Sequence, residues 1–213
     1  MNIKILEKIP VTWEERMAFE QEVLTLEGNW EDYWEVVEEA PFKIEYFNKQ
    51  LILMGQASDT HELIVANIIR LLGNLFYDTE YRVYGSNRLI YVESCAAAFE
   101  PDVSVASGNL QSISFQRKDG RNMQANLNPA IVVEILSEGT KTYDLTEKLP
   151  CYKTIPSVQQ IIYVDQSKPG VSVYSRTPNP HEWLNVDLSD LSKSIVVNKQ
   201  ALLLSDIYKN VGF

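Results

Sequence analysis

Apolar residues recur at helical spacing in several separate stretches of the chain. Residues 58–77 form the longest of these, and Ser58 can cap the helix. Thr12 and Glu15 have capping-box spacing, which predicts a helix over about 12–26; residues 30–40 predict a second, acidic helix. Residues 141–154 predict another helix, kinked at Pro150 because proline lacks the amide hydrogen that a helix interior requires.

Alternating apolar and polar positions predict the strands. Residues 43–54 read as a hairpin that turns at Asn48-Lys49, and 158–165 with 171–176 as a second hairpin. Further strands are expected at 81–84, 88–92, 102–106 and 130–137, with weaker ones near 183–187 and 195–204. Residues 107–128 read as a long polar loop. This order predicts an α/β (α+β-like) fold with a mixed central sheet flanked by helices, rather than a barrel or a doubly wound sheet.

Composition places the chain among globular proteins. Its 213 residues are 45% hydrophobic, enough for one domain with a sizeable core. No apolar run approaches the roughly 20 residues that cross a bilayer, and the first residues lack a signal-peptide pattern. Cys95 and Cys151 are too few for a disulfide framework. We therefore expect a cytoplasmic protein with reduced thiols and no membrane partner.

The net charge of −10 weighs against a nucleic-acid partner, but it is unevenly distributed. Residues 1–45 hold 12 of the 29 acidic residues against 4 basic ones, a net charge of −8, whereas the rest of the chain carries −2. The acidity therefore belongs to an N-terminal arm. Arg117, Lys118 and Arg121 form a local basic cluster in the 107–128 loop, and we expect them to contact nucleic acid; the alternative is an ordinary solvated surface loop.

Glu134 interrupts the apolar run "AIVVEILS", where a buried carboxylate costs several kcal/mol unless it is paired, protonated or metal-bound. Strand alternation puts it on the face of Val132 and Leu136. Asp102 occupies a similar position in "FEPDVSVAS". If the two strands pair, both carboxylates can share one Mg²⁺ or Mn²⁺. The alternative is a carboxylate satisfied by lysine, arginine or backbone donors.

Lys148 is a cation that can reach Glu134. It lies four residues after Asp144 and so shares a helical face with it, beside an apolar stripe that can dock on the sheet. The alternative is a surface Asp144–Lys148 pair worth at most about 0.5 kcal/mol.

Other polar residues have two readings each. Glu45 can complete a metal site or be an exposed hairpin acid, and His61 can orient a phosphate or water or simply begin a helix. His181 reads as a loop histidine. Ser137 reads as a turn or cap residue, since no nucleophile-elbow motif surrounds it.

Over roughly residues 30–190 the chain resembles the Uma family of restriction-endonuclease-like proteins, within the PD-(D/E)XK nuclease superfamily. The matching positions are Glu45, His61, Pro101-Asp102, Glu134, Ser137, Thr140, Asp144, Lys148, Tyr152 and "IIYVD". Two positions depart from the usual pattern. Leu136 stands where the superfamily lysine usually lies, so Lys148 from the following helix is the match, and Lys49 replaces the hairpin glycine.

The resemblance implies a metal-dependent endonuclease acting on DNA. Together with the charge distribution it predicts two parts, an acidic helical arm at 1–40 packed on the core and a restriction-endonuclease-like domain at 41–213. It implies a homodimer and Mg²⁺ or Mn²⁺ as cofactor. The residues it implies are Asp102, Glu134 and Lys148 as catalytic, Glu45 as a third ligand, and His61 and Asp144 as auxiliary. Two alternatives stay open: an inactive nuclease-like module used for binding or dimerisation, and a metal-dependent enzyme for small phosphorylated substrates.

Overall fold

The computed structural model describes residues 10, 12–19, 21–116, 120, 122–179 and 181–213. Its helices are α2 (Trp13–Met17), α3 (Trp30–Glu39), α4 (Asp59–Phe76), α5 (Lys141–Tyr143), α6 (Leu149–Thr154) and α7 (Leu204–Ile207). A 3-10 turn covers Glu93–Cys95, and a π-helical turn, Asp144–Lys148, joins α5 to α6. Among the described helices, none combines the length and apolar composition that crossing a membrane requires.

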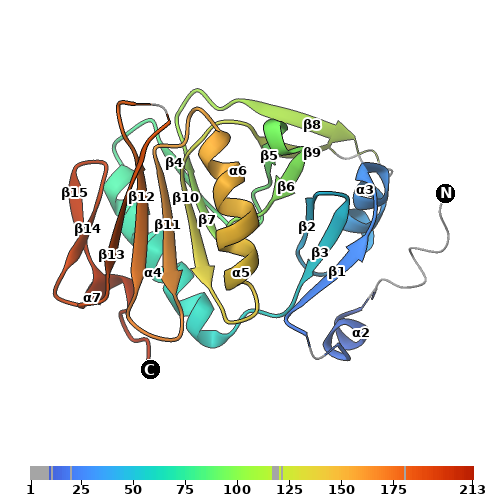
Figure 1. Cartoon of the computed structure of the whole chain (residues 1–213), viewed down its shortest axis with the longest axis horizontal. Helices are drawn as coiled ribbons and strands as arrows, with labels where there is room; N and C mark the ends of the chain where they lie inside the picture. Colours follow the sequence, from blue (N-terminus) through green and yellow to red (C-terminus); the bar gives the residue numbers. More distant parts are fainter. Residues whose placement is uncertain (1–9, 11, 20, 117–119, 121, 180) are drawn as a thin grey trace.

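A six-stranded sheet forms the centre of the fold. Its strands, in spatial order, are β13 (Trp183–Leu188), β12 (Val171–Arg176), β11 (Gln160–Asp165), β10 (Pro129–Leu136), β7 (Val103–Ala106) and β4 (Arg82–Gly85). Only the β10–β11 pair is parallel, and the helical segment α5–α6 crosses between these two strands. Figure 1 shows α4 on one face of this sheet and α5–α6 on the other. The predicted mixed sheet flanked by helices is confirmed.

A second sheet and a small hairpin complete the fold. The seven-stranded sheet has the order β1 (Val23–Glu27), β3 (Gln50–Met54), β2 (Ile44–Phe47), β6 (Ala97–Phe99), β5 (Ile90–Val92), β9 (Asn122–Asn126) and β8 (Ser112–Gln116). The hairpin pairs β14 (Ser194–Val197) with β15 (Gln200–Leu203). Asn48 and Lys49 both have positive φ in the predicted turn of the β2–β3 hairpin. Asn198 and Lys199 repeat this turn, so the single strand predicted at 195–204 is wrong.

The predicted helix over 12–26 is correct only at its start. Thr12 and Glu15 form the expected capping box, with both hydrogen bonds at 3.1 Å, but α2 ends at Met17. Residues 23–27 instead form β1, which pairs with the edge of β3. Leu24 and Leu26 pack there against the apolar cluster between α3 and the sheet, a tertiary contact that outweighs local helix propensity. The division of the chain at residue 40 stays a prediction, although β1 and β3 share a sheet across it.

The polar loop predicted at 107–128 is also wrong, because most of it forms the β8–β9 hairpin. Polar residues in this segment alternate with apolar ones such as Phe115. The Phe115 ring stacks on Trp34, with ring centroids 4.1 Å apart. Arg117, Lys118 and Arg121 lie outside the described residues, and their contact with nucleic acid stays a prediction.

Cys95 and Cys151 form a disulfide, with Cα atoms 6.0 Å apart, so the expectation of reduced thiols is wrong for this structure. The bridge ties the 3-10 turn to α6 across a sequence separation of 56 residues. Cross-links over long loops restrict the unfolded chain and typically stabilise by about 2–4 kcal/mol. Cys95→Ala should lower the free energy of unfolding by that amount in urea denaturation without reductant. Reductant should do the same to the unsubstituted protein, and two free thiols with no loss of stability would contradict this.

Candidate active site

Glu134 lies at the middle of β10, a strand whose eight residues are all buried. The strand pairs with β7 in antiparallel register, with Val133 opposite Val103, so Asp102, the residue immediately before β7, comes close to Glu134. Val132 and Leu136 pack with α6 on the same face as Glu134, whereas Ile131, Val133 and Ile135 pack in the other core. The two strands therefore pair, which was the condition for both carboxylates to share a metal, and the predicted alternation along β10 is confirmed.

Lys148 fills the space between β10 and the crossover helix and is 1% exposed. Its Nζ lies 2.7 Å from Glu134 Oε1 and 3.1 Å from both Glu45 Oε1 and Asp144 Oδ1. Burial lowers the pKa of Lys148, but Glu134 and Glu45 outweigh it, and the net pKa lies well above the usual value. Lys148 is therefore a fixed, protonated cation. Because Asp144 is also buried, the alternative of a surface Asp144–Lys148 pair is wrong.

The helix that supplies Lys148 departs from α geometry at this point. Asp144–Lys148 is a π-helical turn, and Pro150 follows in the first turn of α6. Proline cannot donate the next backbone hydrogen bond, and π-turns occur frequently at functional sites. The helix predicted over 141–154 is therefore divided into α5, the π-turn and α6, and the kink predicted at Pro150 stays a prediction.

Tyr152, one of the positions that match the family, had no role assigned from the sequence, and it lies in the site. Its hydroxyl donates to Glu134 Oε1 at 2.7 Å, the same oxygen that Lys148 contacts. Both contacts therefore use one oxygen of Glu134 and leave Oε2 available. Burial raises the pKa of Glu134 to about 8; Lys148 opposes this, and Asp144 adds to it. The sequence signal for this contact was spacing. Tyr152 lies four residues after Lys148 and so shares its helical face, and a buried tyrosine hydroxyl usually finds a hydrogen-bond partner.

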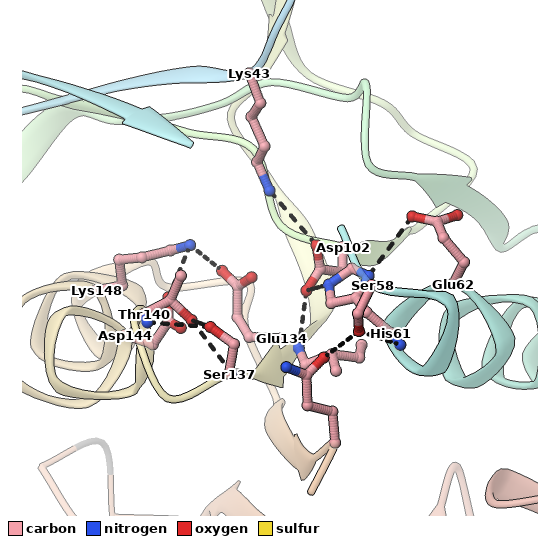
Figure 2. A network of polar contacts seen from close by, with 12 residues as sticks. Lys43, Ser58, His61, Glu62, Asp102, Glu134, Ser137, Thr140, Asp144 and Lys148 are labelled. Atoms are coloured by element: carbon pink, nitrogen blue, oxygen red, sulfur yellow. Dashed lines mark hydrogen bonds and ion pairs between the residues drawn. The ribbon is translucent and has the colours of Figure 1, made fainter. Parts of the chain in front are cut away.

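Asp102 is held from three sides. Its Oδ2 accepts from the Ile135 amide at 2.8 Å and lies 3.2 Å from His61 Nε2, and its Oδ1 lies 3.5 Å from Lys43 Nζ. Burial favours the neutral acid, but these partners prevail and hold the pKa of Asp102 well below its usual range. The same contact raises the pKa of His61, although burial opposes it. Figure 2 shows Glu134 between Lys148 on one side and Asp102 with His61 on the other.

Lys43 was missed by the sequence reasoning, although it lies two residues before Glu45 and so shares its strand face. The side chain of Glu45 is fully buried, which excludes an exposed hairpin acid. Glu45 Oε1 accepts from Lys148 Nζ and from the Glu100 amide at 2.8 Å. Glu45 is therefore placed to hold Lys148 in position. Its role as a third metal ligand stays a prediction.

Ser137 and Thr140 form the turn between β10 and α5. Their hydroxyl oxygens lie 3.1 Å apart, and the Thr140 amide donates to Ser137 Oγ at 3.1 Å. The sequence reading of Ser137 as a turn residue agrees with this. His181 lies in an exposed loop, as predicted, and its amide donates to Asn179.

A pocket of about 540 Å³ opens over these groups. Asp102, Glu134, Asp144, Lys148 and His61 all contribute to its lining, whereas Glu45 does not. Within the described part of the chain, no three His, Cys, Asp or Glu side chains form a ready metal cage. A magnesium site needs less, because Mg²⁺ commonly uses one or two carboxylates and keeps several waters. Asp102 together with the available Oε2 of Glu134 fits that requirement.

Comparison with known proteins places the sequence in a family. The sequence model of the Uma2 family, described as "Putative restriction endonuclease", matches residues 30–201. Two uncharacterized Synechocystis sp. proteins, sll1609 and slr1290, are similar in sequence. The first is 28% identical over 74% of this chain and 85% of its own length, and the second 27% over 75% and 80%.

A solved structure is similar in fold. It is the crystal structure of "a putative nuclease belonging to DUF820" from Anabaena variabilis, with a TM-score of 0.60 and 17% identity over 93% of this chain and 98% of that one. The two chains therefore share a fold. With the family model covering most of the sequence, from Trp30 to Ala201, the chain belongs to the Uma2 family of restriction-endonuclease-like proteins.

Proposed function

We propose that this protein is a metal-dependent endonuclease that hydrolyses phosphodiester bonds in DNA. The observation that carries the proposal is the placement of two carboxylates from paired strands, Asp102 and Glu134, at one pocket beside a fixed lysine. Family membership supports a nuclease-like function. Asp102 and Glu134 would hold Mg²⁺ or Mn²⁺, which lowers the pKa of a bound water and offsets charge on the phosphate.

The protein's own groups have distinct tasks in this proposal. Lys148 stabilises negative charge that develops on the phosphate oxygens, a role suited to a preorganised cation in a site shielded from water. Tyr152 and Lys148 orient Glu134 through Oε1, which leaves the second oxygen for the metal. His61 and the Ile135 amide hold Asp102 in its ionised form.

DNA cleavage tests the proposal. Linear, supercoiled and branched DNA should be cut in the presence of Mn²⁺ and left intact when EDTA is added. Asp102→Asn should cut at least a hundredfold more slowly, because an amide is a poorer ligand for a hard cation. Equal cleavage by the asparagine variant, or cleavage in EDTA, would contradict the metal-dependent assignment.

One observation favours a second candidate, a catalytically inactive module used for binding or dimerisation. Lys43, His61 and Lys148 already pair with the carboxylates, so their charge is partly offset without a metal. An inactive module would leave all three DNA substrates uncut with or without Mn²⁺. The homodimer and the cytoplasmic location stay predictions.

A further inference from the structure

The pocket over the carboxylates has an apolar wall that the proposed chemistry does not use. The carboxylate end is polar, but the lining continues over Trp13, Val37, Phe42, Met54 and Met123. Two of these residues, Trp13 and Phe42, are aromatic and lie with ring centroids 5.6 Å apart in an edge-to-face arrangement. The volume of about 540 Å³ falls within the usual range for small-ligand sites.

Trp13 belongs to α2, before the part of the chain that the family model matches. Its side chain is 40% exposed, so a large aromatic surface is left uncovered at the pocket. The helix is held firmly, because the buried Arg16 donates to the carbonyl oxygens of Leu53 and Met54 on β3 at 3.1 and 3.2 Å. The indole is therefore presented from an anchored position.

The charge of the lining argues against recognition of an intact duplex through its phosphates. Six acidic residues line the pocket against two lysines, Lys43 and Lys148, and both lysines are paired with carboxylates. Duplex binding depends on lysine and arginine contacts to many phosphates. Stacking of a base on an aromatic side chain needs no such charge and contributes roughly 1–3 kcal/mol per base.

We propose that the pocket receives one unpaired nucleotide, whose base stacks on Trp13 while the adjoining phosphate lies at the carboxylates. The preferred substrate is then a single strand, or an unpaired position in a duplex. A base that is already unpaired avoids the energy of unpairing and unstacking that an intact duplex must supply. This inference rests on the proposed action on nucleic acid and adds the substrate class.

Binding measured without cleavage tests the inference. Fluorescence anisotropy with a labelled 12-nucleotide single strand, and with the same sequence as a duplex, is measured at low salt with Ca²⁺ in place of Mg²⁺ or Mn²⁺, and gel electrophoresis of the samples checks that the DNA stays uncut. The single strand should bind at least about tenfold more tightly than the duplex, the equivalent of one stacked base. Trp13→Ala should lose about tenfold in affinity for the single strand and leave duplex affinity unchanged, whereas Trp13→Phe should stay within about threefold of the unsubstituted protein.

Phe19 provides a matched control, because it is 41% exposed, follows α2 and is not among the residues that line the pocket. Phe19→Ala should bind like the unsubstituted protein, and thermal melting should show that the variants fold. Three results would overturn the inference: the single strand and the duplex bind equally well, the single strand does not bind detectably, or Phe19→Ala loses as much affinity as Trp13→Ala. Because the assay needs no cleavage, an inactive protein that still shows the Trp13-dependent preference would contradict only the proposed catalysis.

Discussion

Lys148→Met should lower the free energy of unfolding by about 3–5 kcal/mol in the metal-free protein at neutral pH. The lysine is buried and contacts Glu45, Glu134 and Asp144, so its loss leaves three buried carboxylates without their common cation. Urea denaturation in EDTA measures the effect. Lys141→Met is the matched control: this side chain is 50% exposed and lies 3.7 Å from Asp165, a contact worth at most about 1 kcal/mol.

The loss in Lys148→Met should also depend on pH. Without Lys148 the pKa of Glu134 rises further, because the lysine is the group that opposes the effect of burial. A carboxyl group whose pKa is raised in the folded protein is protonated to a greater extent in the folded than in the unfolded state. The free energy of unfolding therefore falls as pH rises above the unfolded pKa of about 4.5. Because the pKa of Glu134 is already about 8 with Lys148 present, the two proteins diverge as pH rises above 8, and the deficit should be larger at pH 9.5 than at pH 7. An equal deficit at both would show that the lysine acts through packing alone.

Glu134→Gln should reduce DNA cleavage by at least about 10²–10³-fold while the metal-free protein stays close to its original stability. Burial raises the pKa of Glu134, which means that its charge is costly in the metal-free site, and a neutral amide of the same shape removes that cost. The glutamine oxygen can still accept from Tyr152 and Lys148. Cleavage rates in Mn²⁺ and melting temperatures in EDTA provide the two readouts. A variant that melts several degrees lower and cuts normally would make Glu134 a structural residue.

The centre of the site could be predicted from the sequence because its residues break strong local patterns. Glu134 is a carboxylate in a strand that is otherwise apolar, and Asp144 and Lys148 share a helical face by their spacing. Strand alternation was enough to place Glu134 toward α6. Which cations meet which carboxylates was harder, because Lys43 reaches Asp102 across 59 residues of sequence. Contacts of that kind depend on the relative placement of two sheets.

Several strands of the seven-stranded sheet were missed for a related reason. Residues 23–27 become a strand because the edge of β3 offers backbone partners, and nothing within the segment itself specifies that edge. Residues 112–116 pair with 122–126 while Phe115 contacts Trp34 on α3, far away in the sequence. Ala97–Phe99 is rich in alanine, which favours a helix in isolation, yet it forms β6 between β2 and β5.

Calorimetric titration with Mn²⁺ tests the central claim most directly, namely that Asp102 and Glu134 together hold one divalent cation. The unsubstituted protein should bind one Mn²⁺ per chain, and Glu134→Gln should bind none in the same concentration range. Glu62→Gln is the matched control, because Glu62 lines the same pocket but its side chain is 67% exposed and lies beside His61. The account would be contradicted if Glu134→Gln bound one Mn²⁺ as tightly as the unsubstituted protein, or if only Glu62→Gln lost Mn²⁺ binding.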